Sequence, residues 1–205
     1  MSSAKSPISR LLERRVRRGE RDAAVLHVSR QGGVTTNDWG EFVVQVRRFG
    51  FGLASMGIER GQVIGIVEAT APETTIALLG ALTLGVKVAD LGDGNDPEES
   101  IELMARAQCS AVVCGAREQA DGLAAAVRKQ CGERRLIGWG AASSVAGVLP
   151  FSQVCLKGAE LLEWEPMRAS RMVALVDDSD DALVLPRARR RSQSISAGTA
   201  ARAEE

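Results

Sequence analysis

The chain has 205 residues, of which 45% are hydrophobic and 25% charged, with 26 basic and 26 acidic side chains. These values are ordinary for a globular protein, and a formal net charge of zero gives no electrostatic reason to expect nucleic acid as a partner. Aromatic residues make up only 3%, which argues against a stacking platform for single-stranded nucleic acid. The N-terminus lacks the apolar core of a signal peptide, and no apolar run is long enough to cross a bilayer, so we expect a cytoplasmic protein.

The first segment, residues 1–21, is basic. From Pro7 to Arg21 it holds six arginines, with apolar residues near helical spacing. One interpretation is an amphipathic helix that makes weak contact with an anionic membrane surface. The other is a solvated leading helix whose apolar stripe docks on the domain behind it. The lack of a Trp or Phe anchor in the stripe favours the docked helix.

Strand and helix patterns alternate from residue 22 to residue 186. The strongest helix begins at Asp38, which forms a capping-box-like start with Glu41, although Thr36 or Asn37 would also serve as the cap. Proline followed by acidic residues marks two later helix starts. The predicted strands are 23–28, 63–67, 86–91, 111–114, 135–139 and 182–185, and the predicted helices are 38–56, 72–84, 96–108, 118–130 and 151–164.

This alternation with short connections predicts an α/β fold, with a mostly parallel sheet flanked by helices on both faces. The pattern stops at Pro186. Four of the five residues 187–191 are arginine, and small or polar residues follow. That composition predicts an Arg-rich disordered tail over residues 187–205.

The cysteines and the single histidine suggest no metal site. There is no CxxC pair and, with only His27, no plausible zinc set, so we expect the thiols to be buried as small hydrophobic groups. His27 lies in a predicted strand without a nucleophile at a suitable spacing, and we expect a structural role. The cysteines are Cys109, Cys114, Cys131 and Cys155.

Three loops contain residue types that bind ligands in other proteins. Residues 92–96 carry two aspartates after a strand, but too few oxygen ligands for Ca²⁺ or Mg²⁺, and a turn with a helix cap is expected. The acidic run 177–181 predicts a solvated linker, with a metal site as the alternative. Residues 138–140 (GWG) are an incomplete GxGxxG on which no helix is predicted to open. We therefore assign no catalytic, cofactor-binding or metal residue.

Five short segments match one known pattern in order and spacing. They are 35–42 (TTNDWGEF), 49–58 (FGFGLASMGI), 71–73 (APE), 79–86 (LGALTLGV) and 96–99 (DPEE). Together they resemble the N-terminal part of adenylate-forming (AMP-binding) enzymes, most nearly long-chain fatty acyl-CoA synthetases. Two positions depart from that pattern, because Arg60 and Gln62 replace the usual Pro and Asp. The resemblance implies the front portion of a large α/β domain.

The resemblance also implies a loop that this chain lacks. In the family a strand is followed by a Ser/Thr/Gly-rich loop with a lysine, which holds the ATP phosphates. Residues 180–185 resemble the acidic lead and the strand, but Pro186 and the arginine cluster stand where the loop should begin. Residues 194–200 are only faintly similar to the loop. A phosphate loop needs small residues, so that several backbone N–H groups can converge on one anion.

We therefore expect a catalytically incomplete homologue that acts in binding or assembly, and not an enzyme by itself. ATP, Mg²⁺ and CoA are expected only for the complete family enzyme. One alternative is a component of a split fatty acid–CoA ligase, supplying part of an acyl or CoA tunnel while a partner carries the ATP site. Another is a frameshifted or truncated gene product. Because a front portion exposes apolar surface, we expect a homo-oligomer or a partner protein.

Overall fold

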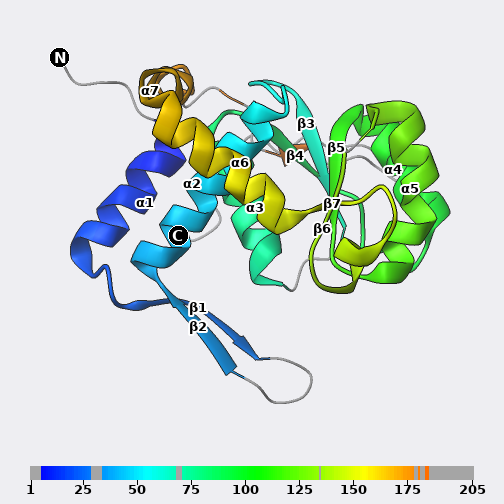
Figure 1. The fold of residues 1–205 in the computed structure, drawn as a ribbon, viewed down its shortest axis with the longest axis horizontal. Coiled ribbons are helices and arrows are strands. Elements are labelled where there is room, and N and C mark those ends of the chain that lie inside the picture. Colours follow the sequence, from blue (N-terminus) through cyan, green and yellow to red (C-terminus); the bar gives the residue numbers. More distant parts are fainter. Residues whose placement is uncertain are drawn as a thin grey trace, which may run out of the picture.

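A computed structural model describes residues 6–28, 34–67, 71–133, 135–177, 180 and 183–184. Figure 1 shows their arrangement. The helices are α1 (Pro7–Arg18), α2 (Trp39–Ser55), α3 (Pro72–Thr83), α4 (Pro97–Ala107), α5 (Arg117–Cys131), the 3-10 helix η1 (Gly140–Ser144), α6 (Phe151–Trp164) and α7 (Pro166–Ala174). The strands are β1 (Ala23–Val28), β2 (Val34–Asp38), β3 (Val63–Ile66), β4 (Lys87–Asp90), β5 (Cys109–Cys114), β6 (Leu136–Gly138), β7 (Leu149–Pro150) and β8 (Leu183–Val184).

Six strands form one sheet in the order β7-β6-β5-β3-β4-β8, and every neighbouring pair is parallel. The first of them in sequence, β3, lies between β4 and β5. The chain therefore leaves β3 in both directions, which creates a switch point at the carboxyl edge of the sheet. β1 and β2 form a separate antiparallel hairpin. The predicted α/β class with a mostly parallel sheet is confirmed.

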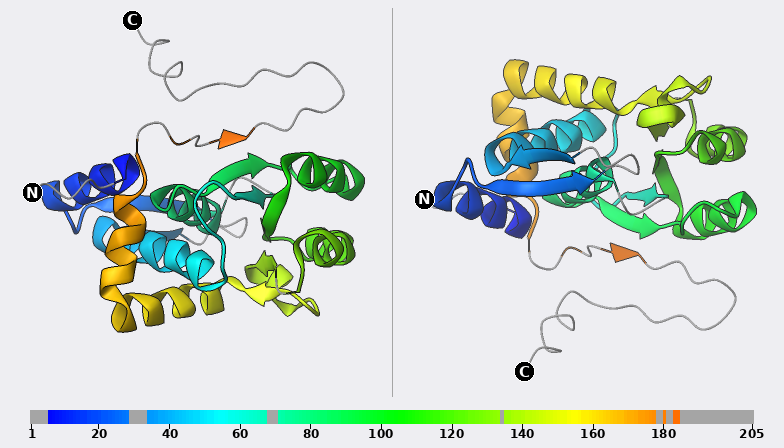
Figure 2. Two further views of the ribbon diagram at one scale, coloured as in Figure 1. Left: turned by 90° about the horizontal axis from the view of Figure 1, so that it is seen from above. Right: turned by 90° about the horizontal axis from the view of Figure 1, so that it is seen from below.

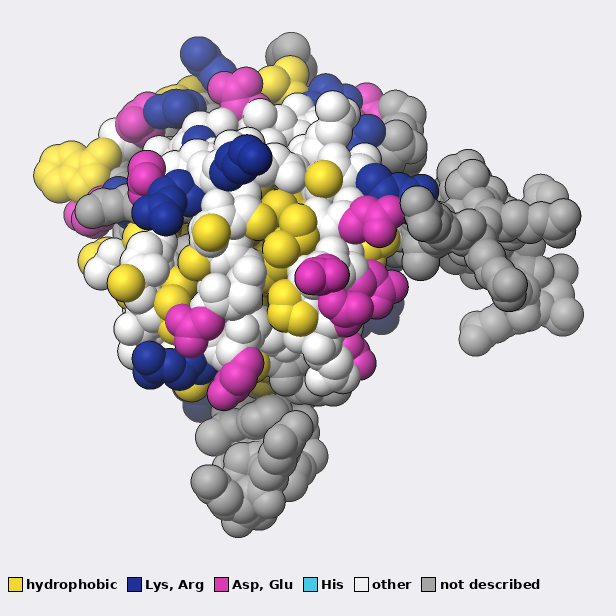
Figure 3. All heavy atoms as spheres, turned by 90° about the vertical axis from the view of Figure 1, so that its right-hand side faces the viewer, with side chains coloured by type: hydrophobic (Ala, Val, Ile, Leu, Met, Phe, Trp, Pro, Cys, Tyr) yellow, Lys and Arg dark blue, Asp and Glu magenta, His cyan; other side chains and the backbone are white. Residues whose placement is uncertain are grey.

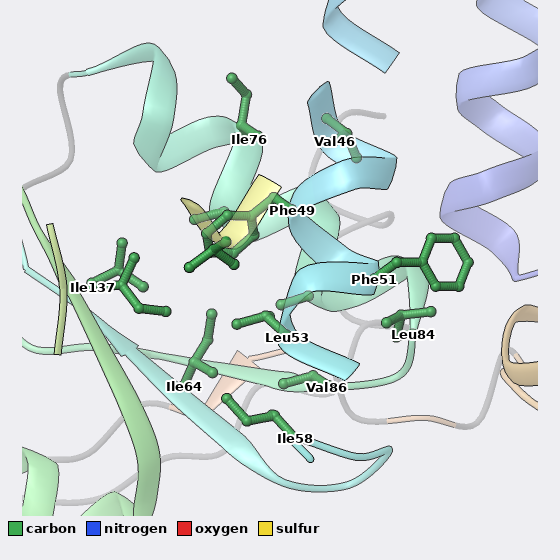
Figure 4. Packing of buried hydrophobic residues seen from close by; sticks show 14 of the residues in the cluster. Val46, Phe49, Phe51, Leu53, Ile58, Ile64, Ile76, Leu84, Val86 and Ile137 are labelled. Carbon is green, nitrogen blue, oxygen red and sulfur yellow. The ribbon is translucent and has the colours of Figure 1, made fainter. Parts of the chain in front are cut away.

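Helices cover both faces of the sheet. α4 and α5 lie on one face, and α2, α3 and α6 lie on the other, with α1 and α7 packed outside them (Figures 1 and 2). Alternate residues of β5 face different layers: Val113 packs with the α2 side and Val112 with the α5 side. In Figure 4, Phe49 and Leu53 of α2 point toward the sheet, whereas Phe51 points away from it.

Local sequence signals set the helix starts. The side chain of Asp38 accepts a hydrogen bond from the backbone N–H of Glu41 at 2.8 Å, so the cap of α2 is Asp38 and not Thr36 or Asn37. Asp96 accepts bonds from the N–H groups of Glu98 and Glu99, and Pro97 is the first residue of α4. These two starts agree with the sequence prediction.

Glycines set how closely α2 approaches its neighbours. A Cβ at Gly52 would collide with the carbonyl group of Val154 in α6, and a Cβ at Gly158 would collide with the carbonyl of Arg48 in α2. On the other side of α2, Gly50 and Gly80 of α3 make the same kind of contact. The three helices therefore touch backbone to backbone, and larger residues at these positions would separate them.

Four elements were not predicted from the sequence. They are β2, which lacks an alternating apolar pattern, the two-residue β7, the short η1, and α7, in which only Ala169 is buried. The predicted tail 187–205 lies outside the described residues. None of the described helices is long and apolar enough to cross a bilayer.

Candidate functional site: a cavity at the carboxyl edge of the sheet

A cavity of about 850 Å³ lies at the carboxyl edge of the parallel sheet. It is bordered by the segments that follow β3 and β6 and by the first turns of α3 and α6. Ligands of open parallel sheets bind at this edge, where the loops leave the strands. Its lining comprises Asn37, Gln45, Arg48, Ala71, Pro72, Glu73, Ile76, Gly138, Trp139, Gly140, Ser143, Pro150, Phe151, Ser152, Cys155, Leu156 and Ala159.

Aromatic residues make the apolar wall of the cavity. The rings of Trp139 and Phe151 meet edge to face, with centroids 6.2 Å apart, and Phe151 stacks on the core residue Phe49 at 4.5 Å. Gly115 lies under the indole, because a Cβ there would come within 2.7 Å of the ring. The wall is thus fixed to the core through Phe49, and its shape depends on a glycine from the neighbouring strand end.

Polar groups lie around the rim. Arg48 and Glu73 supply one charge of each sign, and α3 and α6 both begin here without a side-chain cap. In the first turn of α3, Pro72 has no N–H, and the N–H of Thr74 donates to the carbonyl oxygen of Ala71 at 3.1 Å. This arrangement can hold an apolar group against the aromatic wall and a polar group at the rim. No group of three His, Cys, Asp or Glu side chains that could hold a metal is present among the described residues.

Cys155 is the one cysteine of the cavity lining, and it is not an activated nucleophile. Burial raises the pKa of its thiol to about 11, against a smaller opposing effect of Arg48. Burial also raises the pKa of Cys109 to about 12, with a further contribution from Cys131. Thiols with raised pKa values are protonated and inert at neutral pH. Cys109, Cys114 and Cys155 are buried, as the sequence analysis predicted.

Cys131 is half-buried, and its thiol donates to the carbonyl oxygen of Cys109 at 3.0 Å. His27 lies in β1, but its side chain is outside the described part of the structure. In the loop 92–96, both carboxylate oxygens of Asp93 accept hydrogen bonds from Asn95, and Asp96 caps α4. These contacts agree with the predicted turn and cap.

Of the acidic run 177–181, the structure describes Asp177 and Asp180, and Asp180 differs from the prediction. Asp180 accepts a hydrogen bond from the Nε of Arg60 at 2.9 Å, and one terminal guanidinium nitrogen lies 2.9 Å from the same carboxylate. The Asp180 side chain is only 20% exposed, so its carboxylate anchors the approach to β8 and is not part of a freely solvated linker. The neighbouring departure from the family pattern, Gln62, accepts from the N–H of Glu59 at 2.7 Å.

The local structure requires a glycine at both positions 138 and 140. A Cβ at Gly138 would come within 2.7 Å of Val148, and Gly140 has a φ of +54°, which favours glycine. A helix does begin at Gly140, contrary to the prediction, but it is the five-residue η1 and not an α-helix. The incomplete GxGxxG therefore serves packing beside the cavity.

The sequence profile described as "AMP-binding enzyme" matches residues 12–185. The chain belongs to the AMP-binding enzyme family. Among curated proteins, none matches it. The matched region begins within α1 and ends directly after β8, so it takes in the whole sheet and the cavity.

Two solved structures share the fold of this family member. A putative long-chain-fatty-acid CoA ligase from Rhodopseudomonas palustris has a TM-score of 0.63 and 15% identity, over 73% of this chain and 36% of that protein. An acyl-CoA synthetase from Brucella canis has a TM-score of 0.60 and 20% identity, over 87% of this chain and 30% of that protein. The chain thus spans about a third of the length of either structure.

Proposed function

We propose that this family member is catalytically incomplete and acts in binding or assembly. The observation that carries the proposal is the sequence directly after β8. The family match ends at residue 185, and the chain continues with Pro186 and an arginine-rich segment. Arginine side chains attract phosphate, but their bulk keeps the backbone from closing around it as a loop of small residues does.

The cavity supports a binding role. Its aromatic wall is attached to the core, its volume suits a small-molecule ligand, and Cys155 in its lining has a thiol with a raised pKa. Exposed large apolar residues support assembly, because such residues are covered when proteins associate. Leu156, at the cavity mouth, is 61% exposed, and Trp164, at the end of α6, is 77% exposed.

The experiment is an adenylation assay with the purified chain, ATP, Mg²⁺ and fatty acids of different lengths, with hydroxylamine to trap any acyl adenylate. A complete acyl-CoA synthetase, assayed alone and mixed with the chain, is the positive control. We expect no hydroxamate from the chain alone and full activity in the mixture. ATP-dependent hydroxamate from the chain alone would overturn the proposal. Light scattering at tens of micromolar tests assembly, for which a monodisperse monomer is the contrary result.

A split ligase is the second candidate, and the position of the cavity favours it. A cavity at the carboxyl edge of the sheet could form one wall of an acyl or CoA tunnel that a partner completes. Affinity purification from the native host should then recover a protein with an ATP phosphate loop. Leu156→Arg, at the cavity mouth, should weaken that recovery, whereas Val44→Arg, at an exposed apolar residue outside the cavity, should not. Recovery without any adenylating protein removes the basis of this candidate.

A further inference from the structure

The outer face of α1 is almost entirely arginine. Its exposed residues are Arg10, Leu11, Arg14, Arg17 and Arg18. Their spacing puts them on one stripe of the helix, because residues three, four, seven and eight apart share a face. No acidic residue lies on this stripe, although Glu13, which is partly buried at its side, comes within 3.9 Å of Arg17.

The inner face of α1 is occupied by the protein itself. Leu12 is 5% exposed, and Ile8 packs against the same core cluster. Arg15 pairs with Asp22 at 3.2 Å and lies 5.0 Å from the centre of the Trp39 ring. Ile8 and Leu12 are therefore docked on the core, as one of the two sequence interpretations held, and cannot enter a bilayer, whereas Leu11 is 58% exposed. The arginine stripe forms the exposed side of α1.

α7 adds a second surface of similar character. Met167 is 69% exposed and Leu175, directly after the helix, is 63% exposed, while Arg168 and Arg171 are exposed between them. α1 and α7 both line a cavity of about 290 Å³, and they lie next to each other at the same end of the molecule (Figures 1 and 2). Trp164, the last residue of α6 and two residues before α7, is 77% exposed.

Positive charge is concentrated at the end of the molecule where α1 and α7 lie. α1 holds five arginines and one glutamate, and α7 holds two arginines and no acid, whereas the whole chain is formally neutral. The face seen in Figure 3, at the α4 and α5 end, carries both signs interspersed. Within the basic end, Arg168 pairs with Glu165 at 3.0 Å, but this exposed pair is weak and exchangeable.

We propose that the exposed faces of α1 and α7 form a docking surface for an anionic lipid bilayer. Arginines would contact the lipid phosphates, and Leu11, Met167 and Leu175 would enter the boundary between head groups and acyl chains. Trp164 has the amphipathic ring that is enriched at membrane interfaces. A nucleic acid would pair with the arginines but would leave these large apolar side chains uncovered, so the combination favours a bilayer.

Vesicle sedimentation with the full chain tests the proposal. The chain should sediment with phosphatidylcholine vesicles that contain phosphatidylserine and not with phosphatidylcholine alone, and salt should weaken the binding. The double variant Arg14→Glu/Arg18→Glu should bind at least about tenfold more weakly, because each basic residue near an anionic surface raises affinity about fivefold. Met167→Ser/Leu175→Ser should reduce the binding that remains at high salt.

The matched control is Arg106→Glu/Arg128→Glu, which reverses two exposed charges on α4 and α5 and should leave vesicle binding unchanged. All variants keep residues 185–205, so arginines there contribute equally to each. An equal loss of vesicle binding in Arg14→Glu/Arg18→Glu and in Arg106→Glu/Arg128→Glu would overturn the proposal. Vesicle binding that does not depend on phosphatidylserine would also overturn it. So would binding to heparin or polyglutamate that depends on Arg14 and Arg18 without vesicle binding, which would assign the surface to an acidic macromolecule.

Discussion

The two faces of the sheet are covered by helices in different ways. On one face, α4 and α5 pack through large side chains such as Met104, Leu123 and Val127. On the other, α2 contacts α3 and α6 through glycines, so the helix backbones touch. The first turns of α3 and α6 come together around the cavity. Side-chain packing tolerates adjustment, whereas backbone contact does not. Substitutions at the helix contacts on the face that carries the candidate site should therefore be the more destabilising ones.

The largest expected effect is a difference in the free energy of unfolding between glycine-to-alanine variants on the two faces of the sheet. Gly52→Ala or Gly158→Ala places a methyl group against a carbonyl of the facing helix and should reduce the free energy of unfolding by about 3 kcal/mol. In Gly122→Ala on α5, the new methyl group would lie 3.0 Å from Pro97, and the gain in helix propensity of about 1 kcal/mol offsets that contact. Urea denaturation measures the free energy of unfolding of all three variants. Similar losses of stability on both faces would contradict the comparison.

Alkaline pH probes one buried thiol on each face. The folded-state pKa values of Cys109 (about 12) and Cys155 (about 11) lie above the ordinary 9.0, so the folded state holds these protons more tightly. Their contribution to stability is full below pH 9 and is lost as pH rises through the folded values. Each thiol should contribute a slope of about 1.4 kcal/mol per pH unit over this window.

Denaturation between pH 8 and 12 measures this loss, and the chain contains no Tyr to add a titration near pH 10. Cys109→Ala and Cys155→Ala should each flatten the decline. In Cys109→Ala, the fall of stability with pH should flatten over a wider pH range than in Cys155→Ala, because the pKa of Cys109 is raised further. If neither variant changes the slope, the thiols are not the groups responsible.

Helix caps should have equal effects on the two faces. Asp96→Ala at α4 and Asp38→Ala at α2 each remove a side-chain acceptor from the first turn and should cost about 1 kcal/mol. Asp→Ser at the same positions should restore most of the loss, since serine also caps. A large difference between the two sites would mean that tertiary contacts, and not capping, dominate one of them.

The smallest effect concerns Arg60, which joins the turn before β3 to the segment before β8. Arg60→Met keeps the apolar stem and removes the charge, and should cost less than about 1 kcal/mol because the pair is partly exposed. Arg106→Met, which breaks an exposed pair within α4, is the control and should cost less still. Thermal denaturation at low and high salt would separate the electrostatic part.

Much of the fold was predictable because its signals are local. The start of α4 needs only Asp96, Pro97 and the acids that follow, and the end of α2 needs only Gly57, whose φ is +75°. The α/β class follows from alternation alone. β7 and α7 were missed because two residues cannot show a period and because α7 buries only one side chain.

The candidate site was not predictable in the same way. Trp139, Phe151 and Arg48 come from separate segments, and each has an ordinary local role in its own element. Gly115 and Gly158 are unremarkable in sequence, since their importance lies in what crosses over them. The ion pair of Asp180 with Arg60 spans 120 positions, and no local pattern indicates it.

Binding of Mg²⁺-ATP to the purified chain tests the central claim most directly. The claim is that the family fold is retained through β8 while the phosphate-binding loop is not. Isothermal titration into folded chain should give only heats of dilution up to millimolar nucleotide. Saturable one-to-one binding in the micromolar range would contradict the claim, because it would require a working phosphate site in this chain.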